Sequence, residues 1–143
     1  MSDRKGFTLI EIIAVMVIIG ILATIAIPNY STMVSQGAAK AAQNNLISIY
    51  NAQKNYYFSA TNGGTYYTIA PAACPDTELN INTALSLNIS DTRFSYCCTN
   101  AGGFTCTASG LGVTLTLTNN PIVLPGAAGA NNPSCAGGNI CPS

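Results

Sequence analysis

One apolar run near the N-terminus constrains the fold of this chain more than any other feature. Residues 7–27 read FTLIEIIAVMVIIGILATIAI, and the only polar side chains among them belong to Thr8, Glu11 and Thr24. A helix of this length reaches about 32 Å, which is enough to cross the hydrocarbon core of a bilayer. The segment therefore needs a membrane or an equally apolar protein surface around it.

The residues before and inside this run argue against two ordinary interpretations. Arg4 and Lys5 precede it, so the positive-inside rule places them in the cytoplasm and the chain after residue 27 on the far side. The run is longer than a typical secretory signal core, and no clear small-x-small cleavage site follows it. Glu11 is unexpected in a plain membrane anchor, because a charge deep in a spanning helix is costly and usually has a function and a partner.

The composition weakens several classes of function. Charged residues make up 7% of the 143 residues, against about a quarter in a typical soluble domain. The lack of His removes imidazole bases and His metal ligands, and five basic residues are too few for nucleic-acid binding. Asp76, Glu78 and Asp91 show no acid–base spacing and only a weak signal for a calcium loop. We therefore expect no enzyme activity, no cofactor, no metal site and no direct nucleic-acid partner.

The junction at the start of the apolar run resembles that of type IV pilin-like precursors, the prepilins with a class III leader. The matching residues are Lys5-Gly6-Phe7-Thr8-Leu9-Ile10-Glu11, in which a short basic leader ends in Gly and a Glu follows the aromatic residue by four positions. The resemblance implies that residues 1–6 are a leader peptide, which a prepilin peptidase removes by cutting between Gly6 and Phe7. It also implies that the new amine of Phe7 is methylated.

The same resemblance assigns Glu11, together with Thr8, to assembly. In pilin-like proteins the matching Glu is thought to pair with the N-terminal amine of a neighbouring subunit, so Glu11 of one protomer would neutralise Phe7 of another. An unpaired carboxylate in an apolar filament core is costly, and a well-placed ammonium group offsets much of that cost. The alternative is that Glu11 is simply protonated in the membrane.

Gly20 and Pro28 also match the pilin pattern. In pilin filaments the stretch between such residues often loses helical hydrogen bonds. Pro28 has no N–H to offer the Thr24 carbonyl, and its ring clashes with that turn, so a kink is expected near it. Close helix packing is the other explanation for Gly20, and both explanations can hold.

Residues 29–59 have the spacing of an amphipathic helix. One stripe at steps of three or four residues, with a single polar member, consists of Ala38, Ala42, Leu46, Ile49, Gln53 and Tyr56. We predict one helix over residues 7–59, with 7–27 as transmembrane segment or filament core and a stop at residues 62–64. An aromatic cluster at its end is interpreted as core and subunit interface rather than as a path for conduction; it consists of Tyr50, Tyr56, Tyr57 and Phe58.

Residues 60–143 are expected to form a globular head. We predict a short helix over 83–88, strands over 93–99, 104–108 and 113–118, and a short edge strand at 122–124. The tail from residue 126 is rich in Gly, Ala, Asn and Pro and should supply little core. The fold class is α+β, a long helix packed on a small antiparallel sheet of three to four strands, as in the pilin fold.

Six cysteines in so short a chain indicate disulfides and an exported location. Cys97 and Cys98 are adjacent, so on a strand they point to opposite faces and need different partners. A three-residue hairpin loop places Cys98 opposite Cys106 and leaves Cys97 for Cys74. A two-residue loop would instead pair Cys97 with Cys106 and leave Cys98 for Cys74. We favour the first register, because it keeps the aromatic residues of the strand facing inward.

The other two cysteines, Cys135 and Cys141, enclose a small loop near the C-terminus. A C-terminal disulfide loop is common in pilins, so the resemblance implies that these two are bonded. A zinc site is the competing interpretation of the cysteines, but the chain lacks His and any CxxC pair.

The function implied by the resemblance is assembly. The chain would be a structural subunit of a type IV pilus, polymerising through its helix into an extracellular filament for adhesion, surface motility or uptake. The alternative is a pseudopilin of a type II secretion system, which forms a short periplasmic piston. Implied partners are further copies of the chain, the prepilin peptidase, and an inner-membrane assembly platform with its cytoplasmic ATPase. The precursor would lie in the inner membrane with its N-terminus in the cytoplasm. A membrane-anchored binding protein or enzyme is the third hypothesis, and no constellation in the head supports it.

Overall fold

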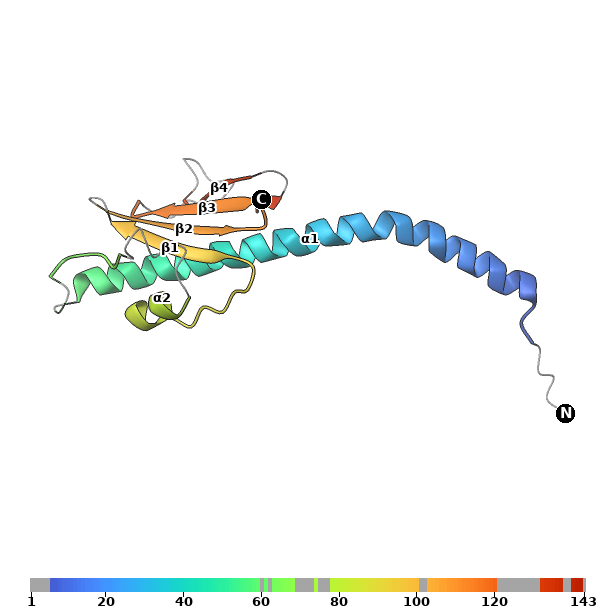
Figure 1. The fold of residues 1–143 in the computed structure, drawn as a ribbon, viewed down its shortest axis with the longest axis horizontal. Coiled ribbons are helices and arrows are strands. Elements are labelled where there is room, and N and C mark those ends of the chain that lie inside the picture. Colours follow the sequence, from blue (N-terminus) through green and yellow to red (C-terminus); the bar gives the residue numbers. More distant parts are fainter. Residues whose placement is uncertain are drawn as a thin grey trace. The chain divides into compact units, whose positions relative to one another are not determined.

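The computed structural model describes residues 6–59, 61, 63–68, 74, 78–100, 103–120, 132–137 and 140–142, without the side chains of Pro28, Glu78 and Leu79. The chain divides into two compact units, Met1–Val34 and Ser35–Ser143. Helix α1 (Leu9–Phe58) runs through both of them (Figure 1), and each unit is described by itself.

The first unit, as far as it is described, consists of the start of α1 and the three residues before it. The helix begins at Leu9 and continues through Gly20 and Pro28. A helix suits this sequence because it satisfies the backbone hydrogen bonds within the segment, which an apolar environment requires. Loss of helix between Gly20 and Pro28 stays a prediction about the assembled state.

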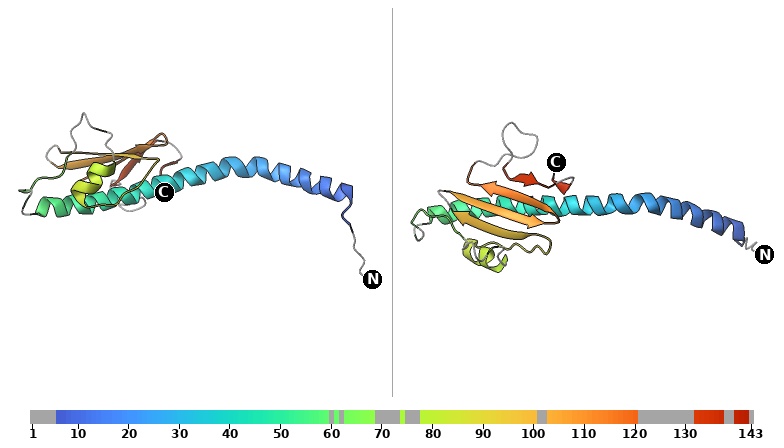
Figure 2. Two further views of the ribbon diagram at one scale, coloured as in Figure 1. Left: turned by 60° about the horizontal axis from the view of Figure 1, so that its bottom comes forward. Right: turned by 45° about the horizontal axis from the view of Figure 1, so that its top comes forward.

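The second unit contains the rest of α1 and a four-stranded antiparallel sheet that lies against it (Figure 2). The strands follow chain order across the sheet and are β1 (Ser95–Asn100), β2 (Phe104–Gly110), β3 (Val113–Thr118) and β4 (Ser134–Ala136). The predicted helical stripe is the face that packs on the sheet, since the side chains of Ala42, Leu46, Ile49 and Gln53 are all 0% exposed. The predicted α+β fold is confirmed.

Strand alternation divides the sheet into an apolar face and a hydroxyl face. Phe104, Cys106 and Ala108 on β2 are buried against α1, as are the three apolar residues of β3. The residues between them on both strands are Thr, Ser or Gly and are not buried. β1 and β2 pair in the register that a three-residue loop produces, with Cys98 opposite Cys106.

A second helix, α2 (Glu78–Leu85), lies beside β1 and differs from the helix expected over residues 83–88. The helix ends at Leu85 because Ser86 adopts a positive φ of 53°. Ile81 and Leu85, four residues apart, are both buried, whereas Ile89 reaches the core from an extended segment. Residues 83–85 of the predicted helix are helical, but its start and its last three residues were wrong, because the helix begins at Glu78 and the chain turns at Ser86.

The fourth strand of the described sheet comes from the tail. Residues 122–124 lie outside the described residues, and the edge strand of the structure is Ser134–Ala136, which pairs with β3. Asn132 and Pro133, just before it, are buried. The tail therefore contributes more to the head than its composition predicts.

Among the described glycines, Gly110 has the least room for a side chain. A Cβ atom on Gly110 would overlap the backbone carbonyl oxygen of Arg93, across the strand pair. We expect Gly110→Ala to lower the free energy of unfolding by about 2–3 kcal/mol, the usual cost of overpacking. Gly37→Ala is the matched control, because a Cβ there meets no atom within 4 Å. It should stabilise α1 by about 0.5–1 kcal/mol. Denaturant unfolding measures whether the free energy of unfolding falls in Gly110→Ala and rises in Gly37→Ala. Equal changes in the two variants would contradict a steric role for Gly110.

Candidate functional site

The predicted cleavage and assembly residues lie at the start of α1. Gly6, Phe7 and Thr8 precede the helix, and Phe7 is 79% exposed. The Thr8 carbonyl accepts hydrogen bonds from the backbone N–H of Glu11 at 3.1 Å and of Ile12 at 3.4 Å. The Glu11 Oε2 atom in turn accepts one from the Thr8 N–H at 3.5 Å.

This arrangement makes Thr8 the N-cap of α1 and Glu11 its third helical residue, the spacing of a capping box. The carboxylate reaches back to a backbone donor that the helix itself leaves unpaired. A negative charge is also favoured there by the helix dipole. Glu11 thus has a local role in helix initiation within a single chain, separate from any contact with another subunit.

An uninterrupted apolar surface follows this junction. The large hydrophobic side chains of the first unit are almost all well exposed, with Ile10 at 71%, Leu22 at 61% and Ile27 at 70%. Within the described part of the chain, α1 is the one helix long and apolar enough to cross a membrane, by length and composition alone. An exposed apolar surface of this extent marks a site of contact with lipid or with another protein.

Gly20 lies on this surface, and no contact in the described part of the chain requires a glycine there. A Cβ atom on Gly20 would meet no atom within 4 Å. Its small size is therefore not required by packing inside this molecule. A close contact with another helix remains the packing explanation.

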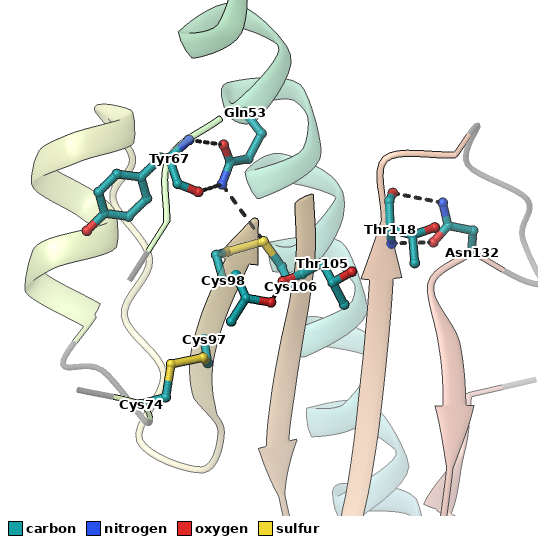
Figure 3. Close-up of a disulfide and its surroundings, with 10 residues drawn as sticks. Gln53, Tyr67, Cys74, Cys97, Cys98, Thr105, Cys106, Thr118 and Asn132 are labelled. Atoms are coloured by element: carbon teal, nitrogen blue, oxygen red, sulfur yellow. Dashed lines mark hydrogen bonds between the residues drawn. A yellow bond between two sulfur atoms is a disulfide. The ribbon is translucent and has the colours of Figure 1, made fainter. Parts of the chain in front are cut away.

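The structure brings the six cysteines together as three disulfides. Cys98 and Cys106 are bonded across β1 and β2, and both are 0% exposed. Cys97, on the opposite face of β1, bonds Cys74 in the segment before α2 (Figure 3). Cys135 of β4 bonds Cys141, which closes a short loop near the C-terminus.

Three side-chain amides hold irregular segments of the head, and two of them, Asn82 and Asn132, were missed in the sequence. Gln53 donates to the Tyr67 carbonyl and accepts from the Tyr67 N–H, both at 2.9 Å (Figure 3). Asn132 bonds the N–H of Thr118 at 2.9 Å and its carbonyl at 3.1 Å. Each amide thus replaces the pairing that a neighbouring strand would supply.

Asn82 makes the same kind of contact at the end of α2. Its side chain bonds the N–H and the carbonyl of Ile89 at 2.8 and 2.7 Å. Single polar residues in polar segments carry no periodic signal, so spacing could not reveal this role for Asn82. Gln53 did have a signal, because it is a polar residue within an apolar stripe.

The aromatic cluster forms packing contacts between α1, the loop after it and β2. The Tyr66 ring lies 4.9 Å from that of Phe104 and 4.6 Å from that of Tyr57, between ring centroids. The Lys54 Nζ atom lies 5.3 Å from the centre of the Tyr50 ring and 5.7 Å from that of Tyr66, within the range of a cation–π contact. Tyr50 and Tyr56 are half-buried against the core, as expected of the cluster, whereas Phe58 is 78% exposed and lies outside it.

The carboxylates of the head show no catalytic arrangement where they are described. Asp91 accepts hydrogen bonds from the Arg93 N–H at 2.9 Å and the Tyr96 hydroxyl at 2.8 Å, which ties the turn before β1 to the sheet. Asp76 and the side chain of Glu78 lie outside the described residues. The described part of the chain contains no group of three His, Cys, Asp or Glu residues that could hold a metal ion.

Comparison with known proteins gives the N-terminal segment an identity. The family model for the prokaryotic N-terminal methylation motif matches residues 1–27. The type IV major pilin protein PilA of Myxococcus xanthus (strain DK1622) is 47% identical over 54 residues, which cover 38% of this chain and 24% of that protein. The type II secretion system core protein G of Escherichia coli (strain K12) is 30% identical over 86 residues, which cover 57% of this chain and 59% of that protein. No solved structure matches the chain.

The chain therefore carries a prepilin-type methylation motif and is homologous to a type IV pilin and to a type II secretion protein. The long helix followed by an antiparallel sheet matches the pilin fold. The chain spans about a quarter of one curated relative and about three fifths of the other. Both relatives are named for a pilus or a secretion system rather than for a catalytic activity.

Proposed function

We propose that this protein is a structural subunit of a type IV pilus, which polymerises through α1 into an extracellular filament. The observation that carries the proposal is that a prepilin-type junction is followed at once by an exposed apolar helix. The methylation motif covers residues 1–27, and the large hydrophobic side chains from Phe7 to Ile27 are well exposed in the part of the chain that the structure describes. Copies of the same helix would supply that cover in a filament, and lipid would supply it before assembly. Adhesion, surface motility or uptake would be the task of the filament.

Processing and partners follow from the same proposal. A prepilin peptidase would cut between Gly6 and Phe7 and methylate the new amine of Phe7. The precursor would wait in the inner membrane with its leader in the cytoplasm. An assembly platform and its cytoplasmic ATPase would then extract it. Glu11 of one subunit would pair with the amine of Phe7 in the next.

N-terminal sequencing and mass measurement of sheared surface filaments test this proposal. We expect a mature chain that begins at methylated Phe7 and contains six half-cystines. A filament subunit that still begins at Met1, or that has free thiols, would contradict the proposed processing and export.

A pseudopilin of a type II secretion system is the second candidate. The observation in its favour is that the match to the type II secretion core protein G extends over 57% of this chain, beyond the 38% covered by the pilin match. Cell fractionation separates the two candidates. A chain found in the periplasmic fraction and missing from sheared surface material would support the pseudopilin and overturn the pilus.

A further inference from the structure

A groove in the head lies between the last turns of α1 and the end of α2. It has a volume of about 720 Å³ and is lined by one face of α1 between Ser48 and Tyr56, by Ser59 and Thr61, and by residues 84–87. All of these residues belong to the second unit. The volume lies within the range of about 300–1,000 Å³ that is usual for small-molecule sites. We call it the α1–α2 groove.

The rim of the α1–α2 groove is polar and uncharged. Asn51 and Asn55 lie one helical turn apart on α1 and are both exposed, as are Ser48 and Ser86. Within the described part of the chain, the side-chain amides of Asn51 and Asn55 have no hydrogen bond to another residue. Each amide offers one acceptor and two N–H donors. Two amides on one helix face can therefore bind several hydroxyl groups at once.

The floor of the groove is apolar and includes one aromatic ring. Leu85 is 6% exposed, and Ala52 and Tyr56, which also line the groove, are half-buried. The Tyr56 ring is held by an edge contact to Tyr67, with 5.9 Å between the ring centroids. A rigid ring beside small apolar side chains forms a surface for the C–H face of a ligand.

These features narrow the chemistry of the ligand. None of the described lining residues is Lys, Arg, Asp or Glu, so neither an anion nor a cation finds a counter-charge. A purely apolar ligand would cover only the floor and would make no hydrogen bond to the polar rim. A neutral molecule with hydroxyl groups at its edges and C–H groups on its faces satisfies both surfaces.

From this combination we propose that the α1–α2 groove binds a neutral oligosaccharide. The amides of Asn51 and Asn55 bind its hydroxyl groups, and Tyr56 packs against a sugar ring. The proposal concerns the head of a single chain and does not depend on whether the chain forms a filament.

The test uses the full chain, purified in a zwitterionic detergent without a sugar headgroup and applied to a printed array of neutral and acidic oligosaccharides. The neutral glycan that binds best is then titrated against the wild-type chain and three variants. Asn51→Ala and Asn55→Ala should each weaken binding by about 3- to 10-fold, the effect of one lost hydrogen bond. Alanine favours the helix more than asparagine does, so neither variant should unfold.

Asn44→Ala is the matched control, because Asn44 is an exposed amide on the same helix that does not line the groove. It should bind the glycan as the wild type does. Absence of binding to any neutral glycan, a preference for acidic glycans, or an equal loss in Asn44→Ala would overturn the proposal. If the two groove variants instead reduce filament yield and the wild type binds no glycan, the groove is a contact between subunits.

Discussion

A Glu11→Ala chain is expected to enter the membrane and to lose its leader, but to form no filaments. Loss of one partner from a buried ion pair costs about 3–5 kcal/mol, because the other charge stays unpaired in an apolar place. At about 1.4 kcal/mol for each factor of ten, this weakens each subunit contact by at least 100-fold. Immunoblots of sheared and membrane fractions measure the two populations. The mass of the membrane form reports whether the leader has been removed.

Glu11→Gln separates the charge of Glu11 from its hydrogen bond. In the structure Glu11 accepts a hydrogen bond from the Thr8 N–H, and the amide oxygen of a glutamine side chain can accept the same bond. If the charge pairs with the Phe7 amine of a neighbour, the Glu11→Gln chain should fail to assemble, as the Glu11→Ala chain does. Normal filaments from Glu11→Gln would show that Glu11 works as a neutral group or as a helix cap, and would contradict the ion pair.

Thr24→Ala is the control for loss of a polar group within the same apolar run. The Thr24 hydroxyl donates to the Ile21 carbonyl at 2.7 Å, so its hydrogen bond lies within its own helix. The methyl group of alanine suits an apolar contact at least as well. Filament yield should therefore stay close to that of the wild type.

The regular parts of the head could be predicted because each residue in them repeats the same signal. Alternation in the segments of β1 and β3 indicated the buried face, and the adjacent pair Cys97 and Cys98 restricted the register of the first hairpin. The stripe on α1 predicted which side of that helix faces the sheet. In each case one periodic pattern and one burial surface point to the same residues.

The irregular parts could not be predicted, because their contacts come from distant parts of the chain. β4 has three residues and exists because the edge of β3 is available to it. Asn132 replaces strand pairing at Thr118 from a segment without any apolar pattern. At the N-terminus, Thr8 and Glu11 stand at capping-box spacing, which predicts the hydrogen bond between them, whereas the resemblance to prepilins implies only contacts between subunits.

Gln53→Met is expected to destabilise the head more than any other change at a buried position of α1 that keeps the size of the side chain. Gln53 is 0% exposed, and both ends of its amide bond the backbone of Tyr67. Methionine fills a similar volume, so the change removes the two hydrogen bonds without leaving a large cavity. Each half-buried backbone group that loses its partner costs about 1–3 kcal/mol, so the loss of two partners should lower the free energy of unfolding by about 2–6 kcal/mol.

The position of Gln53 explains why a polar residue lies in an otherwise apolar stripe. The described residues 63–68 after α1 form neither helix nor strand, and Gln53 supplies the donor and the acceptor that hold Tyr67 against the helix. Asn44→Met makes the same loss of an amide at an exposed site on α1 and should change stability by less than about 0.5 kcal/mol. Guanidinium unfolding of both variants in one detergent, with the disulfides intact, measures the difference. If Gln53→Met is as stable as Asn44→Met, apolar packing at this site outweighs the two hydrogen bonds, and Tyr67 is held by its other contacts.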